Sequence, residues 1–475
     1  MLSRFCCQFV ILTGLAVCLL GASLSSPCFG QDYSYHRYKN QKSDYEKTVR
    51  SLLADAEADL GITIEIDKKA ESYLDLKIPV ALWKLTADPV RRLSYILAPV
   101  DLTFEQKEDG TWRVFEPWYY VRPEAESKAH LERLLKRFPD KASWEQRKAD
   151  LTAAITARFQ LDKLDKKFPI KPILSEKRVY DGYSVQNAAL EILPGYYLCG
   201  SLYQPEPAGD NCPIVLCPHG HGKKGRFGED QQKRAATLAR MGAVCFAYNM
   251  FAWQEQESPL KWEDHRDAIS GPIQTLQTMR AIDYLTSLDG VDASRIGITG
   301  ASGGGTQTFM GAALDPRITV AVPVVMVSSH FQGGCPCESG IPFHIDCTGT
   351  CNAEVAAMIA PRPLLVVAVT QDWTKNVPEV EYPYLKQIYG YFGAADKVEY
   401  AISDEPHNYG PTKRAAMYPF LAKYLGLDEK KIDESKVTVE LPEVMYAFGV
   451  DHKDYPADAV QSLDDLKKRI GMGAE

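Results

Sequence analysis

The sequence predicts an α/β protein with a mostly parallel sheet, covered by helices on both faces, and a small N-terminal α/β domain. Between residues 196 and 403, short apolar runs such as "PIVLCPHG" and "PLLVVAVTQ" are nearly continuous, as in strands buried on both faces. Stretches with helical periodicity, such as "IQTLQTMRAIDYLTSL", separate them. This alternation indicates parallel strands joined by helices. The 475 residues also change in texture near residue 168, so we expect more than one unit.

The composition is that of a globular protein, with 45% hydrophobic and 24% charged residues. The formal net charge is -8. An acidic chain without a basic patch gives no reason to expect nucleic acid or an anionic membrane surface as partner.

Residues 1–30 are expected to be a signal peptide. Arg4 precedes an apolar run from Phe9 to Leu20, and small residues follow it, which is the pattern of a secretory signal with cleavage between Ala22 and Gly30. Two alternatives are a retained N-terminal anchor and a lipoprotein modified at Cys18, where Val17 is bulkier than that motif prefers. We expect the mature protein to be periplasmic or secreted, without a stable membrane span, in an oxidising compartment.

Residues 44–117 are expected to form the small α/β domain. "DYEKTVRSLLADAEADLG" has helical spacing, and "ITIEID" alternates like a strand. Asp88-Pro89 opens a second helix, and Asp109-Gly110 turns a hairpin. The pattern resembles the short N-terminal domain of secretins and TonB-dependent receptors. The resemblance implies a module that docks an unknown protein or envelope component; an unrelated small α/β domain is the alternative.

Three further units follow along the chain. Residues 118–168 have helical spacing and are expected to be a helical linker. Residues 169–428 hold the apolar runs and are expected to be the catalytic domain. Residues 429–475 are a C-terminal extension with one strand-like run and no assigned role.

One serine stands among glycines between an apolar strand and a helix. Gly300-Ala301-Ser302-Gly303-Gly304 is a G-x-S-x-G sequence at that junction. A nucleophilic serine needs a sharp, strained turn to raise its hydroxyl above the sheet edge, and small neighbours permit that turn. We therefore expect Ser302 to be a catalytic nucleophile.

A serine nucleophile needs a base and an orienting acid. Asp372 follows the strand "PLLVVAVTQ", and His407 follows the strand "KVEYAIS". The carboxyl ends of parallel strands are where ligands bind in such sheets, so Asp372 is expected as the acid and His407 as the base. The alternatives for these two roles are Glu338, Asp404 and Glu405 for the acid, and His330 and His344 for the base.

The loop after an early strand is expected to complete an oxyanion hole. The backbone N–H of Gly303 is one donor, and the N–H of His221, in "CPHGHG", is the other. Metal binding by His219 and His221 is a weaker alternative, because the neighbouring sequence offers no third ligand. No metal and no cofactor is expected.

These motifs resemble the acetyl xylan esterase-like and dienelactone hydrolase-like group of the α/β-hydrolases. "CPHGHG", "GASGGGTQT", "APRPLLVVAVTQDWT" and "EPHNYG" stand where that group carries its oxyanion loop, nucleophile, acid and base, and the resemblance covers Lys171 to Leu427. Two departures put the substrate in doubt. Gly303 stands where the group has Gln, and Asn408 stands where it has Glu.

The resemblance implies an α/β-hydrolase fold and an exported serine carboxylic-ester hydrolase. By analogy, its substrate would be a small-molecule or carbohydrate ester, with acetylated carbohydrate such as xylan as the leading expectation. A serine peptidase of the prolyl-oligopeptidase type and a non-catalytic envelope protein that binds glycan are the alternatives.

The segment after residue 333 is rich in cysteine. Cys335-x-Cys337 and Cys347-x3-Cys351 are expected to form disulfides in an exported protein. Free buried thiols and a metal site that includes His344 are the alternatives.

Three aromatic residues are candidates to contact a substrate. Phe251 and Trp253 follow the strand "AVCFAYNM", and Trp373 follows Asp372. Their rings are expected to lie against a sugar; ordinary loop packing is the alternative.

Overall fold

The computed structural model describes residues 46–472, apart from 69, 80–86, 98–99, 101, 116–121, 258, 340–349, 451 and 453. The expected signal peptide, His344 and Cys347 lie outside the described residues. Within the described residues, no helix has the length and apolarity needed to cross a membrane.

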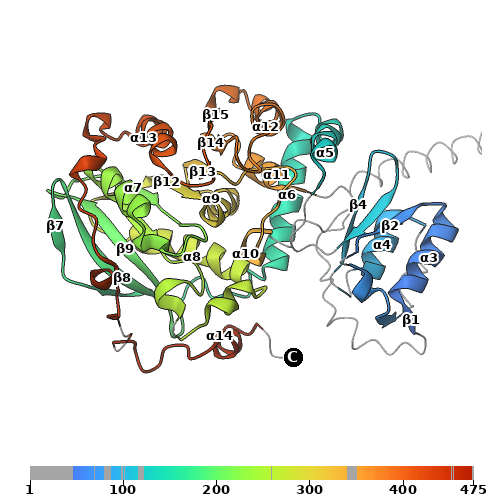
Figure 1. The fold of residues 1–475 in the computed structure, drawn as a ribbon, viewed down its shortest axis with the longest axis horizontal. Helices are drawn as coiled ribbons and strands as arrows, with labels where there is room; N and C mark the ends of the chain where they lie inside the picture. The colour runs from blue at the N-terminus through green and yellow to red at the C-terminus, as the bar shows by residue number, and fades with distance from the viewer. Residues whose placement is uncertain are drawn as a thin grey trace, which may run out of the picture.

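The N-terminal unit is a small α/β layer structure (Figure 1). Its three-stranded sheet has the order β2-β5-β4, with bounds Ile64–Ile66, Trp112–Phe115 and Thr103–Gln106. Helices α3 (Val49–Leu60) and α4 (Pro89–Leu97) bury Leu52 and Leu93 in the same core as Val114. A short β1 (Glu46–Thr48) pairs with β3 (Lys77–Pro79). The expected hairpin at Asp109-Gly110 joins β4 and β5.

A 10-stranded sheet organises the remainder of the chain. Its order is β15-β14-β13-β12-β10-β11-β9-β8-β6, with β7 paired to β8. Neighbours from β11 to β15 pair in parallel, whereas β6 to β9 are antiparallel. The strand bounds are Lys171–Leu174 (β6), Arg178–Tyr180 (β7), Tyr183–Leu193 (β8), Tyr196–Pro205 (β9), Cys212–Leu216 (β10), Val244–Tyr248 (β11), Val291–Ala301 (β12), Val320–Val324 (β13), Leu364–Val369 (β14) and Val398–Ser403 (β15).

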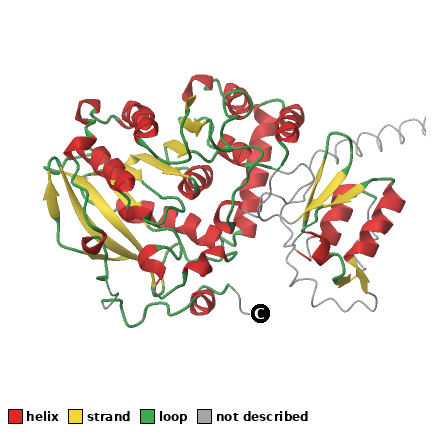
Figure 2. Cartoon of the chain, viewed as in Figure 1, coloured by secondary structure: helices red, strands yellow, loops and turns green. Residues whose placement is uncertain are grey.

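Helices cover both faces of this sheet, as the sequence predicted (Figure 2). On one face, α7 (Glu229–Arg240) and α13 (Pro411–Leu425) share a core with residues such as Val215 and Val322. On the other face, α8 (Ser270–Leu285), α9 (Gly303–Leu314), α11 (Asn352–Ala357) and α12 (Glu381–Gly390) share a core with residues such as Ile214 and Ile298.

The segment predicted as a linker is part of that second core. It forms α5 (Glu124–Arg137) and α6 (Lys141–Arg158), and Asp140 caps α6 by accepting a hydrogen bond from the Ser143 N–H at 2.9 Å. Trp144 and Leu151 of α6 are buried in the same cluster as Ile298. The two helices therefore belong to the body of the catalytic unit and do not form a free spacer.

The C-terminal extension lies along the antiparallel end of the sheet and ends near α14 (Leu463–Arg469) (Figure 1). The strand-like run expected in this extension does not form a strand, because side chains make hydrogen bonds to its backbone groups. Gln232 bonds both the N–H and the carbonyl of Glu440, and Asn187 donates to the carbonyls of Val444 and Tyr446.

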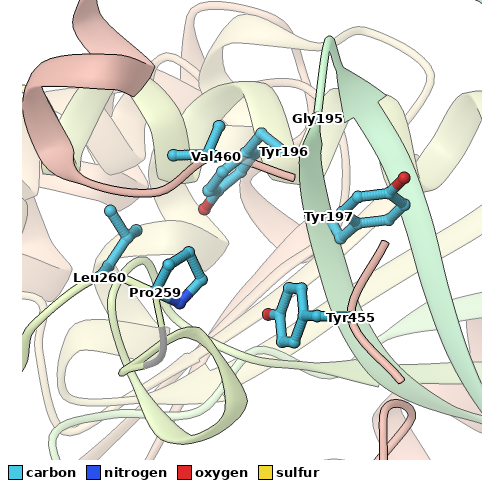
Figure 3. A pocket seen from close by; sticks show the side chains of 7 residues that line it. All are labelled: Gly195, Tyr196, Tyr197, Pro259, Leu260, Tyr455 and Val460. Atoms are coloured by element: carbon cyan, nitrogen blue, oxygen red, sulfur yellow. The ribbon is translucent and has the colours of Figure 1, made fainter. Parts of the chain in front are cut away.

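A small pocket lies between this extension and the turn that joins β8 and β9 (Figure 3). Its lining is Gly195, Tyr196, Tyr197, Pro259, Leu260, Tyr455 and Val460. None of these pocket residues is a candidate catalytic residue.

Candidate active site

Ser302 occupies a strained turn between β12 and α9. Its φ is 57° and its ψ is −124°, a conformation that a residue with a Cβ adopts only when its surroundings hold it there. The approach is close: a Cβ on Gly300 would lie 2.6 Å from the carbonyl oxygens of Gly304 and Pro218. The glycines of G-x-S-x-G are thus required by backbone contact at this turn.

Asp372 and His407 lie together at the ends of β14 and β15. Oδ2 of Asp372 accepts a hydrogen bond from Nδ1 of His407 at 2.7 Å. The other carboxylate oxygen of Asp372 accepts from the Thr374 N–H and hydroxyl, both at 2.6 Å. The Asp372 side chain is 3% exposed and that of His407 is 30% exposed. An acceptor at Nδ1 leaves Nε2 of a neutral imidazole free to take a proton.

Ser302 is not hydrogen-bonded to His407 among the contacts that the structure describes. Its hydroxyl lies 3.5 Å from Oε1 of Glu338, at the outer limit of a hydrogen bond. In substrate-free hydrolases the bond between nucleophile and base is often long, and it tightens when substrate binds.

Glu338 lies in α10 (Pro336–Ser339) and has three neighbours at the site. Besides Ser302, its carboxylate accepts from the Gly334 N–H at 3.0 Å and lies 3.2 Å from Nδ1 of His221. Burial lowers the pKa of His221, but hydrogen bonds with Cys335 and Glu338 outweigh it and raise that pKa to about 10. Glu338 therefore orients the His221 ring.

The loop after β10 is pressed against the serine turn. A Cβ on Gly220 would lie 2.5 Å from the Ala301 carbonyl oxygen and 2.8 Å from the Ser302 Cβ. The His221 ring approaches Gly303, since a Cβ there would lie 3.0 Å from its Cε1. The two residues expected to supply the oxyanion donors, Gly303 and His221, are thus neighbours in space.

His219 supports this loop from within the protein. Its Nδ1 donates to the Gly220 carbonyl at 2.8 Å, and its Nε2 accepts from the Met250 N–H at 3.2 Å. Burial lowers the pKa of His219 to about 3. Both ring nitrogens are occupied, so His219 is a neutral structural residue and not a metal ligand.

The other candidates for the acid and the base have partners of their own. His330 lies 3.1 Å from the Ser328 hydroxyl. Glu405 pairs with Lys413 at 2.5 Å, and Asp404 bonds the Thr370 hydroxyl. None of these three residues contacts Ser302 or His407 among the described hydrogen bonds.

The structure corrects the expectation of disulfides at Cys335, Cys337 and Cys351. Cys335, Cys337 and Cys351 are buried free thiols, and Cys347 lies outside the described residues. The reason is that Cys337 turns toward two imidazoles, with its Sγ 3.3 Å from Nε2 of His221 and 3.2 Å from Nε2 of His265. His265 was not among the predicted site residues, because it lies 70 positions before Cys335 and no sequence motif links the two.

The aromatic candidates differ in position. Phe251 is completely buried, so its ring is not available to a substrate, and this expectation was wrong. Trp253 packs on the rings of His221 and His265, with centroids 5.5 and 5.1 Å apart. Trp373 lies 4.5 Å from the His407 ring and is the aromatic neighbour of the base.

Comparisons with known proteins show similarity to esterases and hydrolases. Residues 274–337, which include Ser302, match the family model described as Acetyl xylan esterase (AXE1). The putative hydrolase YtaP of Bacillus subtilis (strain 168) is 24% identical over 258 residues, which are 50% of this chain and 84% of that protein. The acetyl esterase Axe7A of Xylanibacter ruminicola is 30% identical over 140 residues, 26% of this chain and 31% of that protein.

A solved structure extends the likeness to nearly the whole chain. The methylesterase BT1017 superposes with a TM-score of 0.71 and 39% sequence identity, covering 90% of this chain and 96% of that one. The shared region therefore includes more than the sheet and its catalytic loops.

Proposed function

Because this chain belongs to the family of α/β-hydrolase esterases that includes the methylesterase BT1017, we propose that its Ser302, His407 and Asp372 hydrolyse a carboxylic ester on a carbohydrate. The relatives support a carboxylic ester hydrolase. The observation that carries the assignment to these residues is the strained conformation of Ser302 at the turn, with the Asp372–His407 pair at the ends of the next strands.

The reaction proceeds in two halves. His407 Nε2 takes the proton of the Ser302 hydroxyl as Oγ attacks the ester carbonyl, and Asp372 stabilises the imidazolium that forms. The N–H groups of Gly303 and His221 receive the negative oxygen. His407 then protonates the leaving alcohol, and a water activated by the same imidazole releases the acid from Ser302.

Two kinds of ester are candidates, and they differ in what leaves first. With an acetylated sugar, Ser302 becomes acetylated and the sugar hydroxyl leaves. With a methyl ester of a sugar acid, the sugar acyl group binds to Ser302 and methanol leaves. The acetyl ester is supported by the family model that covers Ser302, and the methyl ester by the name of the relative that matches 90% of the chain.

A labelled fluorophosphonate tests the nucleophile directly. The reagent reacts with a serine only when a base and an oxyanion hole activate it, so we expect the label on the peptide that contains Ser302. A folded chain that remains unlabelled would favour the alternative of a non-catalytic glycan-binding protein.

The products identify the ester. The chain is incubated with acetylated xylan and with a methyl-esterified polyuronate, and acetate and methanol are measured. Acetate alone supports the acetyl ester, and methanol alone the methyl ester. Release of neither, by a chain that fluorophosphonate labels and that cleaves aryl acetates, would contradict a carbohydrate substrate.

We also propose that the chain is exported. The apolar run from Phe9 to Leu20 and the small residues after it support a cleaved signal peptide. The N-terminal sequence of the protein produced in a Gram-negative host tests this. A start between residues 23 and 31 is expected, and an intact N-terminus would contradict it.

A further inference from the structure

Four side chains beside the active site converge on one point. His221, His265, Cys335 and Cys337 each offer one ligand atom, and these atoms all lie within 4.8 Å of one another. They come from the loop after β10, from the 3₁₀-helix η6 (Trp262–Arg266) and from the segment that opens α10. His265 and both thiols are buried.

The hydrogen bonds at the outer ring nitrogens fix the protons of the two histidines. Nδ1 of His265 lies 2.6 Å from the Phe251 carbonyl oxygen, which only accepts. Nδ1 of His221 faces the Glu338 carboxylate at 3.2 Å. In their neutral forms both rings therefore carry the proton on Nδ1 and a lone pair on Nε2.

The two lone pairs point at each other. Nε2 of His221 and Nε2 of His265 are 3.0 Å apart, and Cys337 Sγ is within 3.3 Å of both. One thiol proton can satisfy only one of the two nitrogens. The second nitrogen needs the thiol proton of Cys335, a proton of its own or a cation.

The donor set selects the cation. Two imidazoles and two thiolates form the Cys2His2 set that binds Zn²⁺ in a tetrahedron. Ligands at the usual zinc distances are separated by roughly 3.3 to 3.8 Å, close to the contacts described above. Two thiolates also neutralise the charge of the ion, which permits burial.

We propose that His221, His265, Cys335 and Cys337 bind a zinc ion. The four protein ligands complete the coordination, so the ion is structural and does not activate water. The Phe251 carbonyl and the Glu338 carboxylate accept from the outer N–H of each histidine, as such acceptors do for zinc-bound imidazole. Trp253 packs on both rings and covers the cluster.

The ion would hold the expected oxyanion loop in place. His221 lies one residue after Gly220, which packs against the Ser302 turn. Cys337 immediately precedes Glu338, which contacts both Ser302 and His221. This consequence for the loop rests on the proposed function, whereas zinc binding itself does not.

Metal analysis of the full chain tests the site. The protein is produced without a histidine tag in zinc-supplemented medium and compared with a Cys335→Ser/Cys337→Ser variant and with Cys245→Ala, which removes a buried thiol from β11 outside the cluster. We expect about one zinc per chain in wild type and in Cys245→Ala, and less than about one tenth of that in the double variant. No zinc in wild type, or equal zinc in all three, would overturn the proposal.

A second measurement on wild type does not depend on whether the variant folds. X-ray absorption at the zinc edge is expected to give two sulfur and two nitrogen ligands, and any other donor set overturns the proposal. The remaining alternative is a disulfide between Cys335 and Cys337. Intact mass tests it, because a disulfide lowers the mass of the metal-free chain by two hydrogens, and finding one between these cysteines would overturn the zinc proposal. Since Ser302 labelling by fluorophosphonate is scored independently, failure of the zinc site and failure of the esterase are distinguishable.

Discussion

Asp372 and Glu338 are the two carboxylates next to the proposed nucleophile and base, and their partners differ. Asp372 holds Nδ1 of His407 at 2.7 Å. Glu338 holds Nδ1 of His221 and reaches the Ser302 hydroxyl only at 3.5 Å. The geometry therefore favours Asp372 over Glu338 as the acid of the proposed triad and gives Glu338 a supporting role beside His221.

Replacing the two carboxylates separately tests this assignment. Asp372→Asn is expected to lower kcat for an aryl acetate by about 10³- to 10⁴-fold, because the amide favours the wrong tautomer of His407. Glu338→Gln keeps an acceptor for His221 and is expected to cost less than about tenfold. The reverse order of the two losses would show that Glu338 is the acid.

Single residues also mark the limit of what the sequence could predict. Ser302, Asp372 and His407 were predicted because each follows a recognisable strand, and the structure places Asp372 and His407 in contact. Phe251 follows a strand too, but no pattern tells which way a loop side chain points, and it is buried. Cys335 and Cys337 were expected to form disulfides. The sequence could not show that His221 and His265 lie beside them, because only the fold brings these four residues together.

The loop between β10 and α7 is the element on which the proposed oxyanion hole depends. A Cβ at Gly220 would meet the Ala301 carbonyl oxygen at 2.5 Å, whereas one at Gly222 would meet nothing within 4 Å. Gly220→Ala must therefore displace the loop from Ser302, while Gly222→Ala is a matched control in the same loop.

We expect Gly220→Ala to lower kcat by about 10²- to 10³-fold, as for loss of an oxyanion donor. Gly222→Ala is expected to stay within about twofold of wild type. The measurement is aryl-acetate hydrolysis, with circular dichroism to confirm folding. Equal activity in both variants would mean that this loop does not supply the donor.

Among the elements, those with a strong local pattern were predicted well. The parallel strands, the β4–β5 hairpin and the serine turn all agree with the sequence. The C-terminal run was misread as a strand, because alternation alone does not reveal that Gln232 and Asn187 would occupy its backbone groups. Helices α5 and α6 were recognised as helices, but not as part of the core.

The join between these helices and the sheet unit includes a buried ion pair. Arg147 of α6 donates to both carboxylate oxygens of Glu354 in α11 at 2.9 and 3.0 Å. The two side chains are 2% and 0% exposed. Removing one charge from such a pair leaves the other uncompensated in the interior.

Glu354→Gln is therefore expected to lower the free energy of unfolding by about 3–5 kcal/mol. Glu145→Gln, in α6, changes an exposed carboxylate that lies 3.7 Å from Lys141, and should cost less than about 0.5 kcal/mol. Urea unfolding of both variants measures the difference. Equal stabilities would show that the ion pair does not join α6 to the sheet unit.

For the whole molecule, the sequence predicted the order of the units but not their contacts. Residues 46–115 form the small α/β unit, and residues 124–425 form the sheet with its helices, α5 and α6 included. The resemblance of the N-terminal unit to the short N-terminal domain of secretins and TonB-dependent receptors stays a prediction, and so does the docking role that it implies. Long-range contacts such as Arg147–Glu354 follow from the packed structure and leave no local signal in the sequence.

Ester hydrolysis by wild type and Ser302→Ala tests the central claim most directly. With an aryl acetate, we expect wild type to turn over and Ser302→Ala to lose at least about 10³-fold in kcat, with unchanged folding by circular dichroism. Activity retained by Ser302→Ala would contradict the assignment of Ser302 as the nucleophile and, with it, the roles given to His407 and Asp372.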